Sequence, residues 1–140
     1  MKRLFIDSSV LFSAAYSARG NARKIILMAM RKELIAVISQ LVIAETELNL
    51  IEKAPEKLHF LRIIIDSVPL EFVRPTKQQV STAAEYSALK DAPIIAAARR
   101  AKADLLVTLD KKHLLGKPEI AKYIGAEIVT PKEAVDQLDQ

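Results

Sequence analysis

Short apolar runs alternate with longer segments of mixed polarity along the whole chain. The short runs are continuous rather than alternating and are rich in Ile, Leu and Val, as is typical of strands buried on both faces of a parallel sheet. They predict five strands, at Lys2–Ile6, Leu34–Ile38, Leu70–Arg74, Leu105–Thr108 and Glu127–Val129.

The longer segments carry apolar residues at helical spacing and begin at capping residues or prolines. They predict helices over residues 8–16, 22–31, 40–53, 55–66, 76–89, 91–102 and 132–138. Strands and helices alternate without a repeat or a linker, so we expect one α/β domain spanning residues 1–140, with three layers and right-handed crossovers.

Composition adds three constraints to this picture. The chain is 51% hydrophobic but only 5% aromatic, so we expect an aliphatic core and no extensive surface for stacking bases. The absence of cysteine excludes disulfides and thiolate metal sites. No apolar run approaches the roughly 20 residues that cross a bilayer, and residues 1–10 resemble a strand rather than a signal peptide. We therefore expect no membrane association and a cytoplasmic location.

Four acidic residues follow predicted strands or open helices: Asp7, Glu45, Asp91 and Asp110. Because parallel strands all end at the same edge of a sheet, we expect these carboxylates to meet there. Such a cluster repels itself unless protons or a cation neutralise it, and carboxylate oxygens suit Mg²⁺ or Mn²⁺. The sequence thus predicts a divalent metal site that handles phosphate.

Each acid also has a purely structural interpretation. Asp7 and Asp91 could cap the helices that follow them, and Asp110 could belong to a turn before Lys111. Asp91 shares the inward face of its helix with Ile94. Taken alone, this residue fits both interpretations equally; beside Asp7 and Asp110, the functional one is favoured.

Glu45 lies at the edge of an apolar stripe that we expect to face inward, formed by Leu41, Ala44, Leu48 and Ile51. Helical side chains lean toward the N-terminus, so Glu45 should point back toward the strand ends. Glu47 and Glu52 satisfy the same periodicity, and geometry favours Glu45 over both.

The remaining candidates for chemistry are weaker. Asp104 precedes its strand and should lie at the opposite edge, as a solvated residue. Neither His59 nor His113 has a matching partner in the sequence, and we expect both to lie on the surface or in helix packing.

Taken together, four motifs resemble those of PIN-domain nucleases, in order and over nearly the whole chain. They are Asp7-Ser8-Ser9-Val10-Leu11, Ser39-x₅-Glu45, Asp91-Ala92-Pro93-Ile94 and Leu106-Val107-Thr108-x-Asp110. The small size is similar to that of VapC-type toxins of toxin–antitoxin pairs and of related stand-alone prokaryotic PIN proteins.

The resemblance implies a five-stranded parallel sheet of order 3-2-1-4-5, with the four acids around one or two ions of Mg²⁺ or Mn²⁺. It also implies that Ser9 and Thr108 support the acids, and that the reaction is hydrolysis of an RNA phosphodiester. An antitoxin partner and a homodimer are further implications, and the apolar helices at 22–31 and 55–66 could supply the dimer interface.

A net charge of +4 and basic residues near the acids are consistent with a bound RNA strand. The residues that we expect to contact RNA are Arg19, Arg23, Lys24, Lys90, Lys111 and Lys112. Contacts of this kind neutralise phosphates and convey little sequence preference.

Alternatives from other classes fit less well. A PIN-like module that binds RNA or protein without activity would not need all four acids. A receiver domain needs paired acids after its first strand, and a DxD phosphatase needs a second Asp where Ser9 stands.

Overall fold

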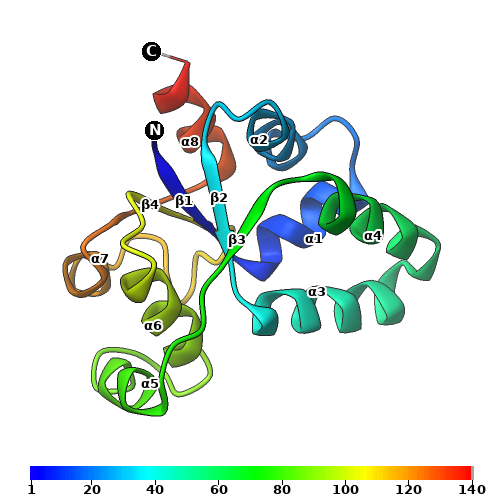
Figure 1. Cartoon of the computed structure of the whole chain (residues 1–140). Helices are drawn as coiled ribbons and strands as arrows, with labels where there is room; N and C mark the ends of the chain where they lie inside the picture. The colour runs from blue at the N-terminus through cyan, green and yellow to red at the C-terminus, as the bar shows by residue number, and fades with distance from the viewer. Residues whose placement is uncertain (140) are drawn as a thin grey trace.

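Five strands follow one another in the order that the hydrophobic pattern predicts, and the predicted helices lie between and after them (Figure 1). A further helix, at Pro118–Ile124 between the last two strands, was not predicted. The computed structural model describes residues 1–139. The strands are β1 (Arg3–Ile6), β2 (Ile35–Ile38), β3 (Leu70–Phe72), β4 (Leu105–Val107) and β5 (Glu127–Val129). The helices are α1 (Ser8–Tyr16), α2 (Asn21–Met30), α3 (Gln40–Lys53), α4 (Leu58–Ser67), α5 (Lys77–Ala83), α6 (Ala92–Arg100), α7 (Pro118–Ile124) and α8 (Pro131–Leu138), with a 3₁₀ turn η1 (Pro55–Lys57) before α4.

All strand pairs are parallel and the sheet order is β3-β2-β1-β4-β5, as predicted. The chain moves from β1 outward to β3, then returns past β1 to β4. Right-handed crossovers therefore place the helices between β1 and β3 on one face and those between β3 and β5 on the other. Accordingly, α1 packs against α2, α3 and α4, and α2 packs against α8, whereas α6 packs against α5 and α7 on the other side (Figure 1).

The three central strands form the most deeply buried part of the core. Leu4, Phe5 and Ile6 of β1 have no exposed surface, and neither does Leu106 of β4. Large aliphatic side chains from α1, α2 and α6 complete the core, which accounts for the low aromatic content.

Two backbone hydrogen bonds extend the sheet beyond the carboxyl ends of β1 and β4. The N–H of Asp7 donates to the carbonyl of Val107 at 3.1 Å, and the N–H of Thr108 donates to the carbonyl of Val129 at 2.9 Å. Asp7 and Thr108 are thereby held side by side at the carboxyl edge, where the predicted site lies.

The helix predicted over residues 76–89 ends early, at Ala83. Beyond it, Glu85 and Tyr86 donate to carbonyls three residues back, in tight turns. The ring of Tyr86 stacks on Tyr123 of α7 at 4.1 Å, so a tertiary contact overrides the local helical preference. The strand predicted to reach Arg74 also ends sooner, at Phe72.

The predicted inward stripe of α3 is wrong, because Leu41, Leu48 and Ile51 are exposed. The buried face instead consists of Val42, Thr46 and Leu50. Both sets have helical spacing, and the sequence pattern alone does not distinguish which of them faces the sheet.

Within residues 1–139, no helix combines the length and apolar character needed to cross a bilayer. The description of residues 1–140 as one domain stays a prediction.

Candidate active site

Asp7 is a nearly buried carboxylate whose two oxygens are held by different donors. Its exposed fraction is 7%, and it occupies the N-cap position of α1. The N–H of Ser8 donates to Oδ1 at 2.8 Å, while the hydroxyls of Thr108 and Ser9 donate to Oδ2 at 2.7 and 3.1 Å. Asp7 therefore caps its helix through one oxygen, and the other is oriented by the two hydroxyls.

The same hydroxyls connect Asp7 to the loop after β4. Thr108 Oγ1 accepts from the N–H of Asp110 at 3.0 Å, and Ser9 Oγ accepts from the N–H of Leu109 at 3.1 Å. Each hydroxyl thus donates to the carboxylate and accepts from backbone. This arrangement fixes the position of Asp110 relative to Asp7.

Asp110 organises the turn that follows it, as its structural interpretation predicts. Its Oδ1 accepts from the N–H groups of Lys112 and His113 at 3.0 and 2.9 Å. The turn brings His113 Nδ1 to 3.4 Å from Asp110 Oδ2. His113 therefore has an acidic neighbour that the sequence did not indicate, whereas His59 is exposed, as expected.

Asp91 precedes the first residue of α6 but makes no capping hydrogen bond through its side chain. Its Oδ2 is the one buried side-chain nitrogen or oxygen within residues 1–139 that has no hydrogen-bond partner. The inward face predicted for this helix is confirmed, because Ile94, Ile95 and Ala98 are buried. A buried carboxylate oxygen without a donor is costly and favours a role other than capping.

Glu45 lies close enough to the other acids to be affected by their charges. Burial raises the pKa of Glu45, and the negative charges of Asp7 and Asp91 raise it further. Burial likewise raises the pKa of Asp91; His113 and Lys90 oppose the shift, and Asp110 and Asp7 add to it. The four carboxylates thus form one group of repelling charges at the carboxyl edge of the sheet.

The donor set of this group fits a hard divalent cation. Its side chains offer carboxylate oxygens, one of them buried without a donor, and their mutual repulsion would be relieved by a positive charge. Within residues 1–139, however, no three Asp, Glu, His or Cys side chains lie close enough to hold an ion together. The expectation that the carboxylate oxygens lie close enough to share a cation is therefore not met.

Thr46 is a residue of this region that the sequence analysis missed. It is fully buried on α3, and its hydroxyl donates to the carbonyl of Val42 at 2.7 Å and to that of Ser8 at 3.4 Å. It thereby ties the helix of Glu45 to the start of the helix that Asp7 caps. Its spacing from Val42 and Leu50 could have identified it as a polar residue on a buried face.

The predicted RNA-binding residues fall into two groups. Lys90, Lys111 and Lys112 are exposed and adjoin Asp91 or Asp110 in sequence. Arg23 instead donates to the carbonyl of Ala14 at 2.6 Å, and its guanidinium lies 5.6 Å from the ring centroid of Phe60.

Lys24 pairs with Asp139, just beyond α8, at 3.7 Å. Because α8 begins at the carboxyl edge and runs back along the sheet, this pair lies toward the opposite edge. Arg19 is exposed in the loop after α1. The structure therefore does not bring Arg23 or Lys24 to the acidic group.

Replacing Asp91 by Asn should stabilise the metal-free protein, because it removes a charge that its neighbours repel. A carboxyl whose pKa is raised on folding costs no stability below its unfolded pKa, and the penalty grows as pH rises through the raised value. We therefore expect Asp91→Asn to increase the melting temperature in EDTA near pH 7, and to change it little near pH 4.

Thermal unfolding of both proteins across this range measures the effect, with Asp104→Asn as the matched control. A lower melting temperature for Asp91→Asn at neutral pH would instead indicate that Asp91 mainly stabilises the helix start.

Comparison with known proteins identifies a matching family and solved structures of similar fold. A family model described as "PIN domain" matches residues 3–112. Among solved structures, PAE2754 from Pyrobaculum aerophilum superposes with a TM-score of 0.69 at 18% identity, covering 99% of this chain and 90% of that one. VapBC2 from Rickettsia felis, bound to a DNA fragment from its promoter, gives 0.61 at 15% identity, covering 91% and 98%.

A third structure is VapC20 from Mycobacterium tuberculosis, a sarcin–ricin loop cleaving toxin. It gives a TM-score of 0.56 at 16% identity, covering 78% of this chain and 91% of that one. No similar sequence was found among curated proteins. At these identities, the superpositions establish similarity of fold.

Proposed function

This chain belongs to the PIN-domain family, and on that premise we propose that it is a metal-dependent endoribonuclease. The proposed catalytic residues are Asp7, Glu45, Asp91 and Asp110, which hydrolyse RNA phosphodiester bonds with bound Mg²⁺ or Mn²⁺. The observation that carries the proposal is the unpartnered Asp91 oxygen, buried within a group of mutually repelling carboxylates. Repulsion within such a group lowers the stability of the fold. In a metal-dependent enzyme, the same carboxylates serve as ligands of the ion.

The four acids that would hold the ion differ in how their side chains are positioned and in their pKa values. Asp7 is oriented by Ser9 and Thr108, so these hydroxyls act as supports for a ligand. Asp91 and Glu45 carry the raised pKa values, so a bound ion would relieve the repulsion between these carboxylates and their neighbours. When bound, such an ion lowers the pKa of a water molecule and offsets the charge that develops on phosphate.

The substrate would be held mainly through its backbone. Lys90, Lys111 and Lys112 border the acids, and lysine contacts to phosphate carry no sequence information. The superposition on VapC20, a sarcin–ricin loop cleaving toxin, supports RNA as the substrate class.

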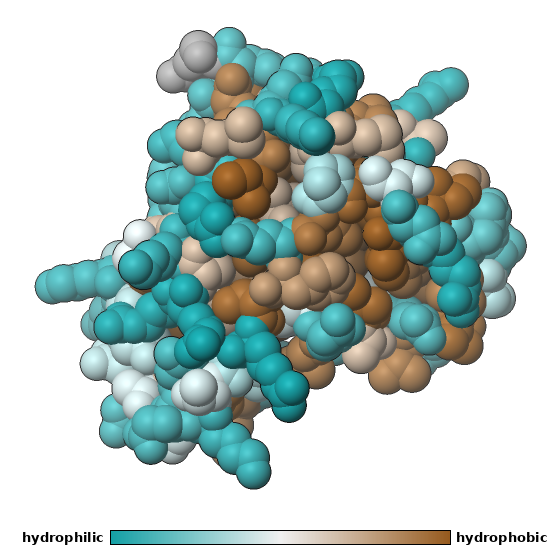
Figure 2. Space-filling model, viewed as in Figure 1, coloured by the Kyte–Doolittle hydropathy of each residue, from teal (hydrophilic) through white to brown (hydrophobic). Residues whose placement is uncertain are grey.

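Protein partners are also part of the proposal. VapBC2 and FitAcB from Neisseria gonorrhoeae share this fold, and the latter superposes with a TM-score of 0.60. Hydrophobic side chains gather on the side of the molecule formed by α1, α3 and α4 (Figure 2), where Leu48, Ile51 and Ile63 are at least half exposed. This surface would suit an antitoxin or a second copy of the chain. The location that we propose for the protein is the cytoplasm.

The test is cleavage of labelled RNA by protein stripped of metal, then supplied with Mn²⁺ or Mg²⁺. We expect cleavage of single-stranded RNA with either ion and none in EDTA, with DNA of the same sequence as the comparison. If neither ion supports cleavage of any RNA, the binding module without activity becomes the better description.

A further inference from the structure

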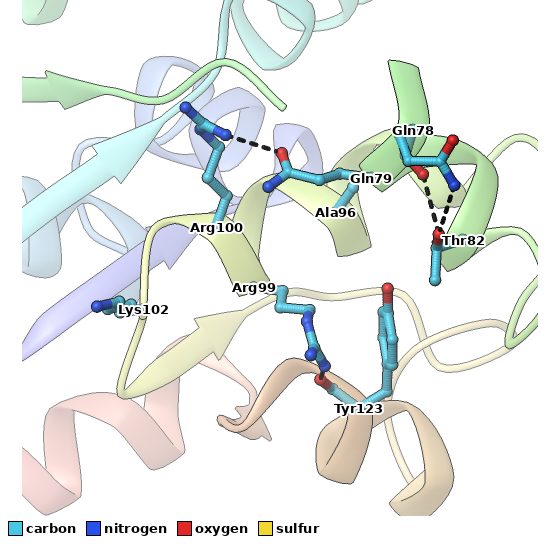
Figure 3. Close-up of a pocket in the computed structure, with 8 residues that line it drawn as sticks. All are labelled: Gln78, Gln79, Thr82, Ala96, Arg99, Arg100, Lys102 and Tyr123. Atoms are coloured by element: carbon cyan, nitrogen blue, oxygen red, sulfur yellow. Dashed lines mark hydrogen bonds between the residues drawn. The ribbon is translucent and has the colours of Figure 1, made fainter. Parts of the chain in front are cut away.

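A second basic region lies away from the acids, in a cleft between α5, α6 and α7 (Figure 3). Its volume is about 370 Å³. The lining residues in the described chain include three cations and no acid; they are Gln78, Gln79, Thr82, Ala96, Arg99, Arg100, Lys102 and Tyr123. A cleft with this lining favours an anionic ligand.

Two lining residues of the cleft, Arg99 and Tyr123, belong to a three-layered stack of side chains, and the third layer, Tyr86, lies outside the lining. The guanidinium of Arg99 lies 4.4 Å from the ring centroid of Tyr123 and also donates to the backbone carbonyl of that residue. Tyr86 stacks on the same ring with centroids 4.1 Å apart and planes 19° apart. Two groups so close to one ring cannot share a face, so Arg99 and Tyr86 cover opposite faces. Tyr86 ends the stack and is 49% exposed.

Arg100 and Lys102 supply exposed positive charge at the cleft. Arg100 donates to Gln79 Oε1 at 3.1 Å, and Figure 3 shows the two side chains pointing toward one another. This bond positions the guanidinium, which has five N–H donors in a planar fork that matches phosphate oxygens.

The cleft and the acidic group are joined by one helix. Asp91 precedes α6, and Arg99 and Arg100 end it. At 1.5 Å per residue, the helix separates them by about 12 Å. The segment from Tyr86 to Lys90 also links the stack to Asp91 along the chain.

We propose that this cleft is a second contact site for the RNA strand that the acidic group cleaves. Tyr86 stacks an unpaired base, and Arg100 and Lys102 contact neighbouring phosphates. A half-exposed aromatic ring near exposed cations matches the alternation of base and phosphate in single-stranded RNA, whereas an acidic peptide offers no base to stack. The inference rests on the proposed function, because it assigns the cleft to the same substrate.

The experiment measures binding without cleavage. Fluorescence anisotropy in EDTA follows a labelled single-stranded RNA of roughly 12 nucleotides, within the length that one binding domain covers. We expect Tyr86→Ala to weaken binding about tenfold, because one base stack is lost, and Tyr86→Phe to bind as the wild type does.

We expect Arg100→Gln with Lys102→Gln to lower the slope of log affinity against log salt by about 1.4, for two phosphate contacts. Glutamine at residue 100 can still bond to Gln79. The matched control is Arg62→Gln with Lys122→Gln, which removes two exposed charges outside the cleft.

Each outcome separates this inference from the proposed function. If the cleft variants bind like the control while the wild type cleaves RNA, the cleft has no role and the nuclease stands. If binding depends on the cleft but no metal supports cleavage, the cleft stands and the nuclease fails. Binding of polyglutamate in place of RNA, with the same dependence on Arg100 and Lys102, would overturn the assignment to RNA.

Discussion

Replacing Asp7 by Asn should reduce metal-dependent RNA cleavage by about 10³-fold or more and leave RNA affinity nearly unchanged. The substitution removes the negative charge at the most buried acid of the group, where no solvent can replace it. RNA affinity should persist because the exposed cations, and not the acids, neutralise phosphates. Initial cleavage rates with saturating Mn²⁺, beside anisotropy in EDTA, measure both effects.

Asp104→Asn is the matched control for this change. Asp104 precedes β4 at the opposite edge of the sheet, where it accepts from the N–H of Arg3 at 2.8 Å. The Asp104→Asn variant should therefore cleave RNA at the wild-type rate. Equal rates for Asp7→Asn and the wild type would remove Asp7 from the catalytic group.

The second large effect should come from Thr108→Val, which removes a buried hydroxyl at almost constant volume. The change takes one donor from Asp7 and leaves the N–H of Asp110 without its acceptor. We expect a loss of about 1–3 kcal/mol in the free energy of unfolding. We also expect about 10–100-fold slower cleavage, as is usual when a group that orients a metal ligand is lost.

Thr108→Ser provides the comparison, because it keeps the hydroxyl and loses one methyl group. Serine should restore most of the activity but less of the stability, measured by denaturant unfolding and by cleavage rate. If Thr108→Val is destabilised yet cleaves as fast as the wild type, the hydroxyl stabilises the fold without orienting Asp7.

The sheet was predictable because its strands are continuous apolar runs. A strand that is buried on both faces is apolar throughout, so its prediction does not depend on which side chains face the core. Leu4–Ile6 and Leu105–Val107 are buried as predicted, and the acids that follow them come to the same edge. The choice of Glu45 over Glu47 depended on the lean of helical side chains. Burial raises the pKa of Glu45, and the negative charges of Asp7 and Asp91 raise it further, which agrees with that choice.

What the sequence could not supply depends on contacts between distant elements. The stack of Tyr86 on Tyr123 ends α5 early, and no local pattern in residues 76–89 encodes it. The helix α3 packs against α1 and α4, and Thr46 and Leu50 lie on its buried side, whereas Leu41 and Leu48 are exposed. His113 enters the acidic group only because Asp110 folds the following residues into a turn.

The most direct measurement is the rate of RNA cleavage as a function of Mn²⁺ concentration, for the wild type and for Asp91→Asn. If the carboxylates hold the ion that cuts RNA, the wild-type rate rises from zero to saturation. Asp91→Asn, having lost a metal ligand, should then need at least about tenfold more Mn²⁺ for half-saturation. A wild-type rate that does not depend on Mn²⁺, or the same half-saturating concentration for both proteins, would contradict the proposed site.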